Sequence, residues 1–146
     1  MNQLALIAPD PPGEIVTRLV ELPFAAISKN VWDKWQSMWQ AGTRNKWRRA
    51  LAEGFERQQF PKGMRHVSVH ARLVFGSRGR RDWQNYVHPM WYFVADALVA
   101  YGCIPDDTPG FFSCGPNGGI EFAVDTRRYV QPKQRRRVIL GFAFEA

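Results

Sequence analysis

The chain has 146 residues, a hydrophobic content of 45%, and 20 Lys and Arg against 13 Asp and Glu, which gives a net charge of +7. This composition is that of a globular domain and excludes a disordered chain. No apolar run approaches the ~18 residues of a membrane-spanning helix, and the N-terminus lacks the charged region of a signal peptide. We therefore expect one domain over residues 1–146, located in the cytoplasm without membrane contact. Its positive charge favours polyanionic partners, nucleic acids first.

The first half of the chain predicts two strands and a long helix. Residues 4–8 form a short apolar stretch that the following prolines end, and residues 15–22 (IVTRLVEL) nearly alternate polar and apolar side chains. After ISKN, with Asn30 as the expected N-cap, apolar residues recur at helical spacing and predict a helix with one face toward a core. Gly42 and Thr43 are the expected bend of this helix. The apolar stripe consists of Trp32, Trp35, Trp39, Trp47, Leu51 and Phe55.

The second half predicts three strands and one more helix. Residues 66–75 (HVSVHARLVF) alternate as a half-buried strand does, and a loop GSRGRRDWQN follows. A helix is expected from Asn85 to Tyr101, with Pro89 in its first turn and Gly102 at its end. Residues 119–124 and 136–144 read as two further strands. The order of the elements predicts an α/β (α+β) domain with one mixed sheet and two main helices.

Four carboxylates flank the second predicted helix. Asp82 precedes it, Asp96 lies within it, and Asp106 and Asp107 follow its end. Carboxylate oxygens suit Mg²⁺, and such an ion can activate water for phosphodiester hydrolysis. The spacing leaves other roles open: Asp82 as a helix cap, Asp96 as an ordinary helix carboxylate, and the Asp106–Asp107 pair as turn formers.

The stretch RRDWQNYVHPMWYFVADALVAYGCIPDDTPGFF resembles the signature of the RusA family of Holliday junction resolvases, D-x-D-N, Lys, D-A-L, Gly and D-D. The upstream ISKN and the arginine-rich helix are similar to RusA-like proteins of phages that infect actinobacteria, and the resemblance covers about residues 27–113. It implies a homodimer that binds four-way junctions and cuts them with Mg²⁺, in the host cytoplasm if a phage encodes it. By this resemblance, catalysis falls to Asp82, Asp96 and Asp107, and metal binding to Asp82, Asp106 and Asp107.

Two positions depart from the family pattern. Gln84 stands where the second aspartate of D-x-D-N is expected, and Tyr92 stands where the lysine is expected. Each electrostatic group of this kind contributes ~3–4 kcal/mol to transition-state stabilisation, so we expect nuclease activity to be reduced or lost while DNA binding is kept. The alternative is a non-enzymatic regulatory protein on the same scaffold, which binds a host protein or DNA.

Clustered cations and aromatic residues mark the expected DNA-binding residues. A basic segment at 127–137 reads either as a hairpin tip that contacts DNA or as a solvated loop. His66 and His70 share one strand face, with metal binding as the less favoured role. Trp83 and Trp91 are core residues or base-stacking residues. The candidate DNA-binding residues are Arg78, Arg80, Arg81, Asn85, His88, Arg44, Lys46, Arg48 and Arg49.

Overall fold

The computed structural model describes residues 14–146, and the strand predicted at 4–8 lies outside these residues. The described chain forms five strands, four α-helices and two short 3₁₀ helices, which confirms the predicted α+β class. In chain order the elements are β1 (Ile15–Leu22), α2 (Lys29–Lys34), α3 (Ser37–Arg57), β2 (His66–Phe75), η1 (Trp83–Tyr86), α4 (Met90–Tyr101), β3 (Phe112–Cys114), η2 (Asn117–Gly119), β4 (Ile120–Val124), α5 (Pro132–Arg135) and β5 (Arg137–Glu145).

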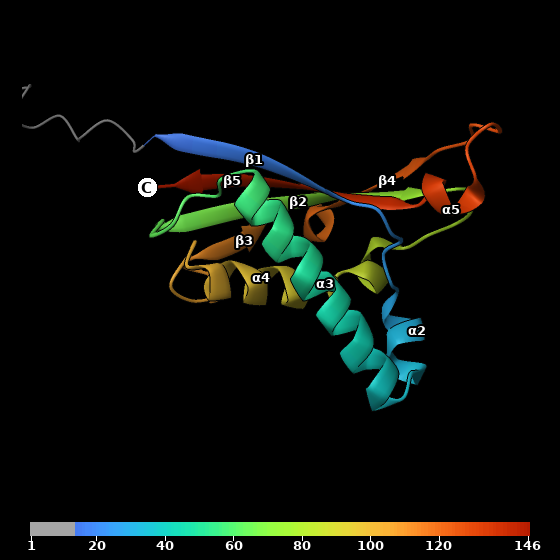
Figure 1. Ribbon diagram of the computed structural model, residues 1–146, viewed down its shortest axis with the longest axis horizontal. Coiled ribbons are helices and arrows are strands. Elements are labelled where there is room, and N and C mark those ends of the chain that lie inside the picture. The colour runs from blue at the N-terminus through green and yellow to red at the C-terminus, as the bar shows by residue number, and fades with distance from the viewer. Residues whose placement is uncertain (1–13) are drawn as a thin grey trace, which may run out of the picture.

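The sheet is mixed, with the strand order β1-β5-β2-β3. β5 pairs antiparallel with both β1 and β2, and β3 and β4 pair parallel with successive parts of β2. Helices α3 and α4 lie together on one side of the sheet, and α5 lies at the end of the sheet where β2 finishes and β5 begins (Figure 1). Within residues 14–146, the other face of the sheet carries no helix (Figure 1). This arrangement leaves the loops at the α5 end exposed to solvent.

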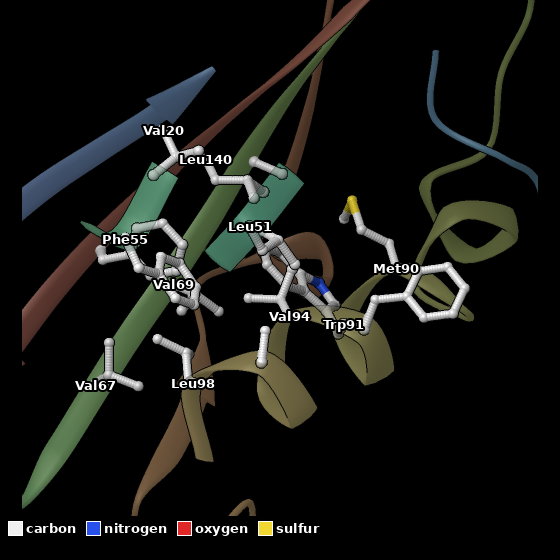
Figure 2. Close-up of a cluster of buried hydrophobic side chains, with 14 of the residues drawn as sticks. Val20, Leu51, Phe55, Val67, Val69, Met90, Trp91, Val94, Leu98 and Leu140 are labelled. Carbon is white, nitrogen blue, oxygen red and sulfur yellow. The ribbon is translucent and has the colours of Figure 1, made fainter. Parts of the chain in front are cut away.

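The core lies between the sheet and the two long helices. Leu51 and Phe55 of α3 and Val94 and Leu98 of α4 are fully buried against Val67 and the alternate residues of the neighbouring strands (Figure 2). The alternation predicted for residues 66–75 is thereby confirmed, because every second side chain from 67 to 73 is buried. Burial of this set fixes the helices on the sheet and so fixes the loops at its ends.

The long helix breaks earlier than predicted. α2 ends at Lys34, Trp35 and Gln36 are extended, and α3 then runs unbroken through Gly42. The prediction of a bend at Gly42 and Thr43 is therefore wrong. Trp39 was expected in the core but is 61% exposed, because the break changes the helical phase of the residues that follow it.

Two helix starts also differ from expectation. The N-cap of α2 is Ser28, whose hydroxyl accepts from the Val31 amide at 3.3 Å, and Asn30 is already helical. α4 begins at Met90 and not at 85, since the residue before a proline is disfavoured in helical conformation and Pro89 follows His88. α4 does end at Gly102 as predicted, with a φ of 86° that favours glycine. None of the helices within residues 14–146 is both long and apolar enough to cross a membrane.

Candidate nucleic-acid interface

In the loop that follows β2, two of the predicted arginines are exposed and the third stabilises the loop through contacts within it. Arg81 stacks its guanidinium on Phe75 at 3.7 Å from the ring centroid and donates to the carbonyls of Ser77 and Gly79 at 3.1 and 3.4 Å. Arg78 and Arg80 are exposed. The loop is therefore shaped by Arg81 while Arg78 and Arg80 remain free for a ligand.

A second basic segment, between β4 and β5, lies at the same end of the sheet. The Asp125 amide donates to the Phe75 carbonyl at 2.8 Å, at the last residue of β2. Arg135 lies 3.5 Å from the carbonyl of Gly76, which is the start of the first loop. Two segments about fifty residues apart in sequence are thus held side by side. We call this surface the basic end and define it by Arg78, Arg80, Arg81, Arg127, Arg128, Lys133, Arg135 and Arg136.

Asp125 is a buried carboxylate beside the basic end that forms ion pairs with two arginines. Its side chain is 5% exposed and accepts from Arg127 Nε at 2.8 Å and from Arg137 at 3.0 Å. The hydrogen bonds from Arg127 hold the pKa of Asp125 well below its usual range, against the opposing effect of burial. Arg137 also reaches Glu21 of β1 at 3.1 Å. Arg137 is therefore a structural ion-pair residue, although it belongs to the same run of arginines as two members of the basic end.

The charge of the basic end is largely uncompensated within the described residues. Of its eight cations, only Arg127 has a carboxylate of the described residues within 4.0 Å, namely that of Asp125. The other ion pairs with lysine or arginine in this part of the chain lie elsewhere or use Arg137. Such a concentration of cations attracts phosphates and repels other cationic surfaces.

The carboxylates predicted to bind metal are not gathered into one group. Asp82 caps η1, accepting from the Gln84 amide at 3.1 Å, and this is the capping role that the sequence left open. Asp96 is exposed on α4. Asp106 and Asp107 follow the far end of α4, which is 12 residues and about 18 Å long, and the Asp106 carboxylate accepts from the Asp107 amide at 2.8 Å. Within residues 14–146, no group of three or more His, Cys, Asp or Glu is placed to hold a metal ion.

Of the remaining residues singled out by the sequence resemblance, Tyr92 and Asp96 lie on the exposed side of α4, and His88 and Asn85 precede this helix. His88, Tyr92 and Asp96 are spaced by four residues, and all three are exposed. The rings of His88 and Tyr92 lie 6.5 Å apart between centroids, and Tyr92 is 54% exposed. Asn85 lies in η1, half-buried, and its amide donates to the Asp82 carbonyl at 3.1 Å. Tyr92 therefore lies on the surface of the protein, at the position where the sequence resemblance leads to the expectation of a lysine.

Two of the four cations predicted on the long helix line a separate cleft. Lys46 and Arg49 line a cleft of about 380 Å³ between α3 and the end of β1, and Lys46 lies over the Phe24 ring at 4.4 Å. A smaller depression shares Glu21 and Pro23 with this cleft and is lined by Lys133, so the cleft leads toward the basic end. The remaining two cations of this helix, Arg44 and Arg48, contact Trp32 and Asn45.

Trp91 and Trp83 pack in or against the core, and His66 contacts polar side chains. Trp91 is buried, and its indole donates to the Gly118 carbonyl at 2.6 Å. Trp83 is half-buried and packs against the core. His66 lies 3.0 Å from the Ser113 hydroxyl and 3.2 Å from a Glu145 carboxylate oxygen, which accounts for it as a polar residue of the helix-free sheet face.

Comparison with known proteins leaves the family unassigned. No family model matches the chain, and no curated protein matches it. Among solved structures, the periplasmic domain of Helicobacter pylori MotB (residues 90–256) is similar over 95% of this chain and 78% of that one, with 14% sequence identity and a TM-score of 0.34. A likeness at this level carries no argument about fold or function.

Proposed function

We propose that this protein binds branched or otherwise structured DNA, such as four-way junctions, through the basic end. The observation that carries the proposal is the convergence of two arginine-rich segments, one after β2 and one before β5, on the same end of the sheet. Arginine guanidinium groups bind phosphates through paired hydrogen bonds, and phosphate contacts supply most of the affinity of proteins for nucleic acids. The net charge of +7 acts in the same direction.

The proposal includes a weak or absent nuclease. Gln84 offers a neutral oxygen and Tyr92 offers no fixed charge at the positions where the RusA pattern has an aspartate and a lysine. The resemblance assigns any residual cleavage to Asp82, Asp96 and Asp107 with Mg²⁺, supported by Asp106. Within residues 14–146 these carboxylates do not form one group that could hold the ion, which also favours weak or absent cleavage. The protein would act as a homodimer, because two strands of a symmetric junction present two equivalent contacts. The proposed location is the cytoplasm, where the DNA is.

The test uses a labelled four-way junction and a linear duplex of matched length and sequence. Both are incubated with the full chain in Mg²⁺, in Mn²⁺ and in EDTA, and band shift and nicking are measured on the same samples. A junction-selective shift with little nicking is the expected result. Ordinary metal-dependent turnover that Asp107→Asn abolishes would overturn the weak-nuclease part, and the absence of any shift would overturn the DNA-binding part.

Salt dependence and a matched pair of variants locate the site. Replacing Arg80 and Arg128 with alanine removes two exposed cations from the basic end, and replacing Lys62 and Arg65 removes two exposed cations at the start of β2. Lys62 precedes the start of β2, about 30 Å from the basic end at the strand's other end. The slope of log K against log salt should fall by about 1.8 for the first variant and stay unchanged for the second. Equal slopes for both variants would place the DNA elsewhere.

A regulatory protein that binds another protein is the second candidate. The helix-free sheet face exposes Ile15 and Leu19, each 59% exposed, on the edge strand β1. An apolar interface on this face would be nearly independent of salt, in contrast to phosphate binding. Loss of a protein complex in Leu19→Glu, with DNA binding unchanged, would favour this candidate.

A further inference from the structure

We propose that Tyr129 stacks on an unpaired nucleobase, so that the basic end selects DNA with unstacked bases, such as the centre of a branch. This inference rests on the proposed DNA binding and adds a residue that specifies the ligand. Tyr129 is 84% exposed, more than Met38 at 72% or Trp39 at 61%. Its ring contributes little to the core, and the fold offers no partner face that would account for it within the described residues.

The position of Tyr129 combines an aromatic face with phosphate-binding groups. Arg127 and Arg128 precede it directly, and the Arg127 guanidinium lies 6.0 Å from the centroid of the tyrosine ring. Proteins that bind single-stranded nucleic acid combine cations, which contact the phosphates, with aromatic side chains on which the bases stack. A protein partner would need an acidic surface around an apolar socket, whereas nucleic acid supplies both features in every nucleotide.

The backbone around Tyr129 is held on both sides. On one side, Asp125 bonds the backbone amide and side chain of Arg127 and is itself tied to the end of β2. On the other side, the Arg135 guanidinium donates to the Val130 carbonyl at 3.1 Å. The tip therefore presents the ring on a constrained segment, which reduces the conformational entropy lost when a base stacks on it.

The location of the tip agrees with binding at a branch. β4 leads into this segment and α5 follows it, so the segment lies at the end of the sheet (Figure 1), and its hydrogen bonds to Phe75 and Gly76 place it beside the loop after β2. Duplex phosphates on the two sets of arginines would bring an adjoining unpaired base to the tip. A continuous duplex offers the tip no free base face, because all its bases are stacked within the helix.

The experiment compares Tyr129→Leu, which keeps an apolar side chain, with Tyr129→Phe, which keeps the ring. Trp39→Leu serves as the control, since Trp39 is an exposed aromatic residue in the first turn of α3, far from α5 (Figure 1). The probes are a four-way junction with 2-aminopurine at the branch point, the same junction without it, and the matched linear duplex. Affinity is measured by anisotropy, and stacking is measured by the change in 2-aminopurine fluorescence on binding.

We expect Tyr129→Leu to weaken junction binding by about 5- to 150-fold, the range for loss of one stacked base, and to remove the fluorescence change. Binding of the linear duplex should be unchanged, and Tyr129→Phe and Trp39→Leu should behave as wild type. If wild type binds the junction but Tyr129→Leu binds it equally well, the stacking proposal is overturned and the proposed function stands. If wild type binds neither DNA, the proposed function itself fails.

Discussion

Replacement of Gly54 by alanine tests the packing of α3 on the sheet, which forms the cationic cleft. Gly54 is buried in α3, and an added Cβ would lie 2.8 Å from Val20 Cγ1 and 3.3 Å from Cγ2. Val20 is β-branched and therefore stiff, and its strand pairs with β5 along all eight residues. The strand cannot withdraw from the new methyl group without weakening that pairing.

Two opposing effects decide the sign of the change. Alanine is favoured over glycine in a helix by ~1 kcal/mol, and overpacking of a core costs ~1–3 kcal/mol. We therefore expect Gly54→Ala to lower the free energy of unfolding by about 1 kcal/mol. Gly42 lies in the same helix with no atom within 4 Å of its ideal Cβ position, so Gly42→Ala should raise it by about 1 kcal/mol.

Urea unfolding of the two variants measures this difference. With an m-value of ~2 kcal/mol/M, the expected gap of about 2 kcal/mol separates the two midpoints by about 1 M. In the double variant with Val20→Ala, the cost of Gly54→Ala should disappear, because the clashing methyl groups are gone. If Gly54→Ala stabilises the protein as much as Gly42→Ala does, α3 does not approach β1 as closely as described and the reasoning is refuted.

Three further predictions concern Asp125 beside the basic end, the two cysteines, and the two positions that depart from the RusA pattern. The pKa of Asp125 is lowered in the folded protein, so its contribution to stability is present above about pH 4, the unfolded value, and is lost as the pH falls through the folded value. Asp125→Asn should therefore reduce the free energy of unfolding at pH 7 and make it depend less on acid. Urea midpoints at pH 7 and 3 measure both effects. Burial raises the pKa of Cys103 to about 11, so a thiol reagent at pH 8 should modify the half-buried Cys114 first, and earlier labelling of Cys103 would contradict this. Gln84→Asp with Tyr92→Lys should increase Mg²⁺-dependent junction nicking by about 10²-fold or more; an unchanged rate would show that these two positions do not limit cleavage.

Regular elements with a repeating pattern were predictable from the sequence. The strand at 66–75 has its predicted bounds, because one buried face forces period-two alternation. The end of α4 at Gly102 was equally clear, since a positive φ at a helix end favours glycine. β3 was missed because three residues are too few to show a period. The break at Trp35 was missed because the tryptophan spacing continues across it, and the rings of Trp35 and Trp39 still lie 6.2 Å apart.

The partners of side chains at the site were harder to predict from the sequence than the helices and strands. Nothing in the local sequence distinguishes Arg137 from its neighbours, yet only its position in β5 brings it to both Asp125 and Glu21. Tyr129 was also missed, because an aromatic residue in a basic loop shows no pattern that separates surface from core. The separation of Asp82 from Asp107 could have been predicted from the sequence, because the length of the helix between them sets the distance.

The arrangement of charge implies that DNA binding and cleavage should separate by mutation. The basic end lies next to one of the candidate carboxylates, because Arg81 shapes one loop and the next residue, Asp82, is the N-cap of η1. Asp96 lies along α4, and Asp107 lies past its end, so a phosphate held by Arg78 and Arg80 would be nearest to Asp82 alone. Neutralising Asp82 should then raise phosphate affinity by removing a nearby negative charge, whereas neutralising Asp107 should leave affinity unchanged. The proposed function assigns Asp107 a role in cleavage alone, so Asp107→Asn should lower any nicking without changing phosphate affinity.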